Sequence, residues 1–167
     1  MVRRKTLAAL VAAVALVVGL APALLAQAGA SALSQAGASV RGAGTTMVEG
    51  GTGSPSFTPV LTTVAFHWAK GSGAFECLAL APSAPAGQPD SGNFDTNAMY
   101  VTGEITSARI RGDQAILRGT AEVTGVGAGS DLPFTVTLTR GGPGATLVLE
   151  VSGLTFREIL LEGEFRF

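Results

Sequence analysis

The chain contains very few of the side chains on which most catalytic and metal sites depend. Its 167 residues include one histidine, one cysteine, one tryptophan and one tyrosine. His67 and Cys77 are too few ligands for a zinc site, and His67 lies within an alternating strand pattern that offers no hydrolase triad. No G-x-S-x-G nucleophile elbow occurs. The sequence therefore predicts a protein that is not an enzyme and that holds no metal or cofactor.

Cys77 is the single cysteine, so no internal disulfide forms and the fold depends on its core. In the run GAFECLALA, Phe75, Cys77 and Ala79 share one face of a predicted strand. No histidine or cation flanks the thiol to activate it. We interpret Cys77 as a small buried apolar residue, the alternatives being a free reactive thiol or an intermolecular bridge.

Charge is also scarce, at 14% of residues. The three basic residues Arg3, Arg4 and Lys5 are clustered at the start, and the rest of the chain is mildly acidic. Without a basic run there is no electrostatic attraction to phosphate backbones or anionic membranes. The sequence thus predicts no nucleic-acid binding, and it does not identify a partner.

The longest apolar run is at the N-terminus. A charged start is followed by the uncharged run 7–26, and then by small residues in which Ala26-Gln27-Ala28 matches the A-x-A cleavage pattern before Gly29. This order predicts a signal peptide over residues 1–28, and a mature protein that is secreted or lies in the periplasm or cell envelope. The alternative is an uncleaved anchor, because about 20 apolar residues can cross a bilayer. Pro22 and the repeated A-x-A triplets favour cleavage.

The remaining chain predicts an all-β domain over residues 40–167, preceded by a flexible lead-in over 29–39. Short alternating runs are separated by glycine, proline, asparagine or aspartate, and no segment has helical periodicity. About eight strands are expected, at 40–48, 58–70, 74–81, 100–110, 114–124, 133–140, 145–151 and 159–167. Short connections favour a single antiparallel meander.

Three mid-strand glycines narrow the architecture. Gly103, Gly119 and Gly163 each fall on the apolar face of a predicted strand. Such glycines mark sharp bends or close backbone approach, which predicts strongly coiled strands and a tight interior. We therefore expect a small closed barrel, with a two-sheet sandwich as the alternative.

The domain also resembles the small secreted β-domains of bacteria known as post-COAP domains, and related secreted proteins. The resemblance covers residues 40–167 and rests on these segments: Gly42-Ala43-Gly44, Val64-Ala65-Phe66-His67, Val101-Thr102-Gly103-Glu104-Ile105, Leu117-Arg118-Gly119-Thr120-Ala121, Pro133-Phe134-Thr135-Val136-Thr137, Gly141-Gly142-Pro143-Gly144 and Leu161-Glu162-Gly163-Glu164-Phe165. It implies an exported, non-enzymatic accessory domain without catalytic residues. Two residues depart from the usual pattern of these domains: Cys77, and Arg140, which stands where an aspartate often precedes the Gly-rich turn.

Few residues are candidates for contact with a ligand. Trp68 and Tyr100 are aromatic residues that can stack on a ligand at a barrel mouth, although Trp68 shares a face with Phe66 and fits core packing better. Glu104 and Glu122 are expected to be ordinary solvated charges rather than a carboxylate pair for glycoside chemistry. The oxygen-rich loop 90–97 lacks the spacing and the terminal glutamate of an EF-hand calcium site. It is expected to hydrogen-bond to its own backbone rather than to bind calcium. Arg111-Gly112-Asp113 is expected to be a hairpin turn, not an adhesive motif.

These features predict an exported, non-catalytic β-domain that acts as a binding or structural module. An outer-membrane barrel is the first alternative, because Ile159, Leu161, Phe165 and Phe167 alternate towards a terminal aromatic residue. One tyrosine and one tryptophan are too few for two aromatic girdles, which argues against it. A lipocalin-like carrier of a small apolar ligand is the second alternative.

Overall fold

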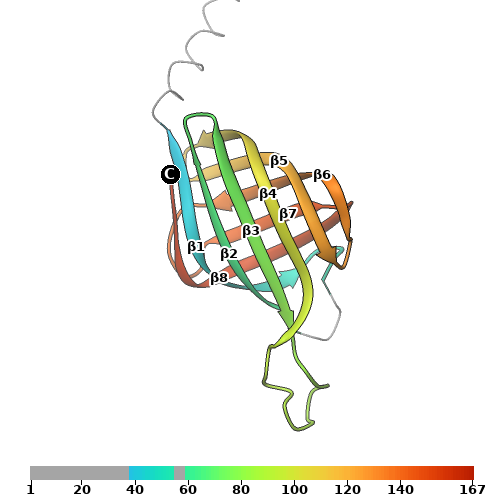
Figure 1. Ribbon diagram of the computed structural model, residues 1–167. Coiled ribbons are helices and arrows are strands. Elements are labelled where there is room, and N and C mark those ends of the chain that lie inside the picture. The colour runs from blue at the N-terminus through green and yellow to red at the C-terminus, as the bar shows by residue number, and fades with distance from the viewer. Residues whose placement is uncertain (1–37, 55–58) are drawn as a thin grey trace, which may run out of the picture. The chain divides into compact units, whose positions relative to one another are not determined.

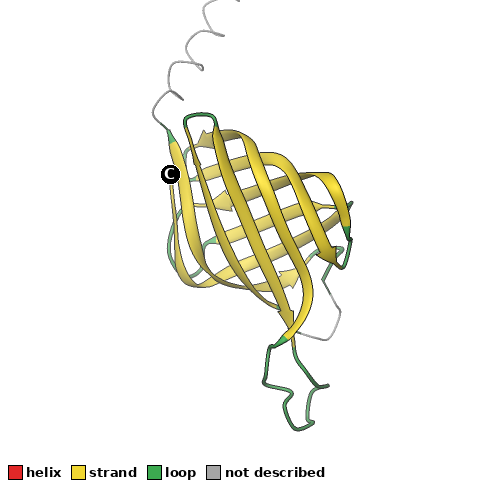
Figure 2. Ribbon diagram, in the orientation of Figure 1, coloured by secondary structure: helices red, strands yellow, loops and turns green. Residues whose placement is uncertain are grey.

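The structure is a computed structural model that describes residues 38–54 and 59–167. The described part consists of strands and loops (Figures 1 and 2). The eight strands are β1 (Ser39–Gly50), β2 (Leu61–Ala69), β3 (Ser72–Ala81), β4 (Thr96–Arg111), β5 (Gln114–Gly125), β6 (Gly129–Thr139), β7 (Thr146–Val151) and β8 (Leu154–Arg166). The predicted signal peptide and residues 29–37 of the predicted lead-in lie outside the described residues. The barrel begins at Ser39, one residue before the predicted boundary.

The strands form one closed barrel in sequence order, and every neighbouring pair is antiparallel. β1 pairs with β8 to close it, with Gly44 opposite Gly163. This confirms the predicted meander barrel and rules out the two-sheet sandwich. Closure leaves no unpaired sheet edge, the feature through which β-proteins aggregate.

Alternation of side chains along each strand gives the barrel its inside and outside. In β2, Val64, Phe66 and Trp68 are buried, whereas Ala65 and His67 are exposed. Neighbouring side chains of a strand point to opposite faces, so this pattern places one set in the core and the other in solvent.

Two-residue turns join β2 to β3 and β7 to β8. Lys70 and Gly71, between β2 and β3, both have positive φ, at 54° and 89°. Ser152 and Gly153, between β7 and β8, also have positive φ, at 55° and 72°. Two-residue turns of this kind match the right-handed twist of the flanking strands. The sequence did not predict the second turn, and β8 begins at Leu154, earlier than the predicted start at residue 159.

The mid-strand glycines lie where backbone comes close to its surroundings. A Cβ at Gly119 would overlap the carbonyl oxygen of Glu104 and approach Phe134 to 2.9 Å. A Cβ at Gly163, whose φ is +112°, would overlap the backbone of Ala43 in β1. Both positions therefore need glycine for close strand approach.

The prediction of which side chains of the last strand point into the barrel is wrong. Leu161 was expected on the inward face with Phe165, but it is 44% exposed, whereas Phe165 is fully buried. The register of β1 against β8 shifts at this point, because Leu160 is opposite Thr46 and Glu162 is opposite Thr45, which leaves Leu161 as an extra residue. Such a bulge reverses the alternation, so the terminal aromatic pattern does not form one continuous face.

Candidate functional site

A cavity of about 350 Å³ lies inside the barrel at the end where β3 finishes and β4 begins. The loop of residues 82–95 projects from this same end (Figure 1). Six of the eight strands contribute to the cavity wall, all except β5 and β6. Its lining is Val48, Gly53, Ser54, Val60, Thr62, Cys77, Ala79, Ala81, Ala98, Met99, Val126, Leu149, Phe156 and Glu158.

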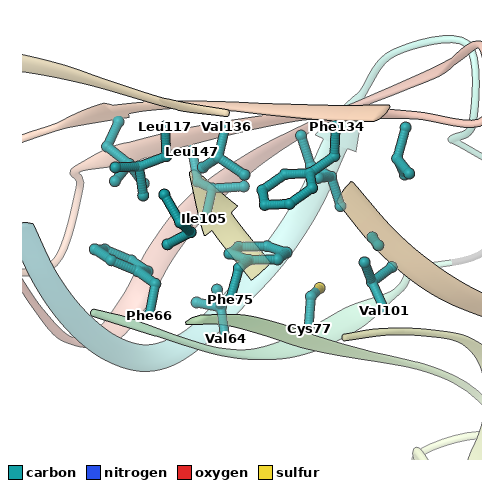
Figure 3. Packing of buried hydrophobic residues seen from close by; sticks show 14 of the residues in the cluster. Val64, Phe66, Phe75, Cys77, Val101, Ile105, Leu117, Phe134, Val136 and Leu147 are labelled. Atoms are coloured by element: carbon teal, nitrogen blue, oxygen red, sulfur yellow. The ribbon is translucent and has the colours of Figure 1, made fainter. Parts of the chain in front are cut away.

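The cavity exists because small and large side chains are segregated along the barrel. The opposite half is filled by aromatic rings: Phe66 lies 5.3 Å from Phe165 and Phe75 lies 5.4 Å from Phe134, between ring centroids. Figure 3 shows Phe66, Phe75 and Phe134 packed among aliphatic side chains. Towards the cavity end, alanines and Cys77 replace these rings. The expectation of a tight interior is therefore right for one half of the barrel and wrong for the other.

One carboxyl group lies in this apolar wall. Glu158, on β8, is 2% exposed. The Oγ1 hydroxyl of Thr62 donates a hydrogen bond of 2.6 Å to its Oε2 atom, and the hydroxyl of Thr46 hydrogen-bonds to the same oxygen. The two hydroxyls also hydrogen-bond to each other. Buried polar groups need such partners, because an unsatisfied one costs about 1–3 kcal/mol.

Burial shifts the pKa of this carboxyl group. Desolvation raises the pKa of Glu158 above its ordinary value, and the hydrogen bonds from Thr46 and Thr62 lower it only in part. Oε2 accepts hydrogen bonds from both hydroxyls, so the two threonines compensate part of the cost of burying the carboxyl group.

Cys77 lines the same cavity from β3 and is buried as a free thiol. Desolvation raises its pKa well above the ordinary value, and the nearby charge of Glu158 adds to the effect. A thiol with a raised pKa is a poor nucleophile. This placement agrees with the interpretation of Cys77 as a packing residue.

Trp68 and Tyr100, the residues singled out for ligand contact, do not come together. Trp68 is 7% exposed within the core, and its Nε1 atom has no hydrogen-bond partner among the described residues. Tyr100 lies on the outer wall, where its hydroxyl donates to Glu76, and this bond raises the pKa of the phenol. Neither residue lines the cavity.

The other candidates are placed on the outside or in loops. His67 and the carboxylates Glu104 and Glu122 are exposed, with Glu104 opposite Thr120 rather than Glu122. In the loop 90–97, Asn93 donates to Asp90 while Asp95 accepts a hydrogen bond from Ser83. No group of three metal-ligating side chains occurs within residues 38–54 and 59–167.

The N-terminal positions Ala26, Ala28 and Gly29 lie outside the described residues, so the cleavage site stays a prediction. In the part of the chain that the structure describes, no helix is long and apolar enough to cross a membrane.

Sequence reasoning missed the polar cluster. Glu158 was overlooked because the last strand was predicted to begin at residue 159, one residue after it. The pattern Phe156-x-Glu158-x-Leu160 would have revealed it. Alternate residues of a strand point to the same face, so a glutamate between two inward apolar residues also points inward.

Comparison of the chain with protein-family models, with curated proteins and with solved structures found no match. The resemblance to post-COAP domains therefore remains a prediction, and the functional argument depends on the cavity itself.

Proposed function

We propose that this protein is an exported, non-catalytic binding module whose barrel holds one small, mostly apolar molecule. The observation that carries the proposal is the cavity of about 350 Å³, which is walled largely by aliphatic side chains. Ligand pockets are typically about 300–1,000 Å³ and combine an apolar wall with a few placed polar groups. The Glu158 cluster is the polar group of this pocket.

The energetic argument is the transfer of apolar surface out of water. Each square ångström of apolar ligand surface that enters the cavity contributes about 25 cal/mol. Met99, Leu149 and Phe156 supply the contacting wall. At the rim, Val126 is 50% exposed and gives an incoming ligand an apolar surface at the entrance.

The outer wall supports a binding module over a membrane barrel. Outward positions of β4 and β5 carry charged residues such as Glu104, Arg118 and Glu122, all exposed. Those of β6 carry threonines, among them Thr135 and Thr137. A lipid-facing barrel needs a continuous apolar band about 25 Å tall; an arginine or lysine on its lipid face costs about 2–4 kcal/mol at the bilayer midplane, and an aspartate or glutamate costs less.

The absence of catalysis is also part of the proposal. Of the titratable side chains in the described residues, only Glu158 and Cys77 line the cavity. Both have pKa values shifted towards the neutral form by burial. His67, the only imidazole, faces outward from β2. This set supports holding a ligand rather than activating a nucleophile.

The test is saturable binding of a neutral fluorescent probe, N-phenyl-1-naphthylamine, to the protein without residues 1–28. We expect one probe per barrel. Ala79→Phe, which places a ring in the cavity, should weaken binding at least about tenfold. Ala65→Phe is the matched control, since Ala65 is an exposed alanine of the neighbouring strand.

Circular dichroism and urea melts should show that both variants are folded. Absence of saturable binding, or equal binding by the two variants, would exclude the cavity as the ligand site.

A further inference from the structure

The hydrogen bonds of Glu158 are all made by one of its two oxygens. Oε2 accepts hydrogen bonds from the hydroxyls of Thr62 and Thr46, whereas no described residue hydrogen-bonds to Oε1. Glu158 lines the cavity and its side chain is nearly inaccessible from outside the barrel. Oε1 is thus a preformed acceptor in an apolar wall, held in place by two threonines from β1 and β2.

The charge of the described cavity wall disfavours an anionic ligand. The lining includes no lysine, arginine or histidine among the described residues. A carboxylate or phosphate ligand would therefore be buried without a counterion, next to an acidic group. Burying an unpaired charge is far more costly than burying a hydrogen-bonded neutral group.

We propose that the cavity selects an apolar ligand with a hydroxyl or N–H group, and that this group donates a hydrogen bond to Oε1 of Glu158. The inference depends on the proposed binding function and adds the chemical class of the ligand. Oε1 can accept this hydrogen bond while Oε2 keeps its hydrogen bonds from Thr46 and Thr62. A ligand that lacks a donor leaves Oε1 unsatisfied.

Strand register supports the placement of the donor at the inner end of the ligand. Thr62 is opposite Thr46 on β1 and opposite Ala79 on β3. Val60, two residues before Thr62, is also buried and lies between Thr62 and the entrance of the cavity. The apolar body of the ligand would then occupy the space between the polar cluster and the entrance.

The experiment compares naphthalenes that differ only in their head group, as competitors of the fluorescent probe. 2-Naphthol and 2-naphthylamine are neutral at pH 7 and carry donors, 2-methoxynaphthalene carries none, and 2-naphthoate is an anion. We expect both donors to bind about three- to tenfold more tightly than the ether, as one net hydrogen bond predicts. The naphthoate should bind most weakly.

Two variants assign this preference to Glu158. Glu158→Met should bring 2-naphthol and 2-methoxynaphthalene to equal affinity. The triple variant Thr46→Val, Thr62→Val, Glu158→Met removes the whole cluster, so no unsatisfied hydroxyl compromises its folding, and it should behave in the same way. Glu150→Met, at an exposed glutamate of β7, is the control that keeps the preference.

The outcomes separate the two proposals. If all the naphthalenes bind without a donor preference, or if the preference survives in both Glu158 variants, the inference about the ligand class is wrong and the binding function stands. If no naphthalene and no probe binds the wild-type barrel, the binding function fails and the inference fails with it.

Discussion

Thr62 and Glu158 are separated by 96 positions in the sequence, yet the hydroxyl of one lies 2.6 Å from a carboxyl oxygen of the other. They meet because β8 closes the barrel against β1, which in turn pairs with β2. The contact places a buried carboxyl group in the apolar wall of the cavity. Glu158 is therefore both the polar anchor of the proposed site and a titratable part of the fold.

The pH dependence of stability should reveal this titration. Because burial raises the folded-state pKa of Glu158 above the ordinary value of 4.5, the folded protein holds the proton more tightly than the unfolded chain. The stabilisation is present below pH 4.5 and is lost as pH rises through the folded-state pKa, by at most about 1.4 kcal/mol per pH unit. Urea melts at several pH values should show this slope in the wild type but not in Glu158→Met. Glu150→Met should follow the wild-type curve, and parallel curves for all three proteins would contradict the assignment.

Gly119→Val should destabilise the barrel by about 1–3 kcal/mol or more, despite the better strand propensity of valine. The reason is the close approach of Gly119 to the Glu104 carbonyl and to Phe134. Gly50→Val is the control, because nothing lies within 4 Å of a Cβ at that position and the strand ends there. Urea midpoints measure both variants. An unchanged midpoint for Gly119→Val would mean that the strands separate easily at this point.

Cys77 should react slowly with 5,5′-dithiobis(2-nitrobenzoate) in the folded protein. Burial raises the pKa of its thiol, so little thiolate is present at neutral pH, and the reagent must also enter the barrel. The same protein in denaturant should react fast. Fast labelling of the folded protein would show that the cavity end opens widely, and bound probe should then slow it.

Export is tested by the N-terminus of the mature protein. Mass spectrometry of material from culture supernatant or periplasm should find an N-terminus between Gly29 and Leu33, as the A-x-A pattern predicts. An intact Met1 in the membrane fraction would instead support an uncleaved anchor.

The behaviour of the isolated barrel tests the membrane alternative. Without residues 1–28, the protein should be monodisperse in plain buffer and give a β-type circular dichroism spectrum, since its outer wall is rich in threonine and charge. Insolubility until detergent is added, followed by heat-modifiable gel mobility, would favour an outer-membrane barrel.

The strands were predictable where the alternation is regular and the turn residues are distinctive. β2 and β5 have both, so their faces agree with the sequence pattern. β8 does not, because the bulge at Leu161 changes its alternation midway. A bulge depends on how β8 pairs with β1, more than a hundred residues away, and so it leaves little local signature.

The sequence by itself determined the all-β class, the order of the strands and the inward faces of most of them, because side-chain alternation and turn residues are local properties of the chain. Only the tertiary structure decided that one half of the barrel is packed with aromatic rings and the other is hollow, and that Thr46, Thr62 and Glu158 form one cluster. Those outcomes depend on the register between strands far apart in the chain. A shift of register changes which side chains meet across the interior without changing the composition of any strand.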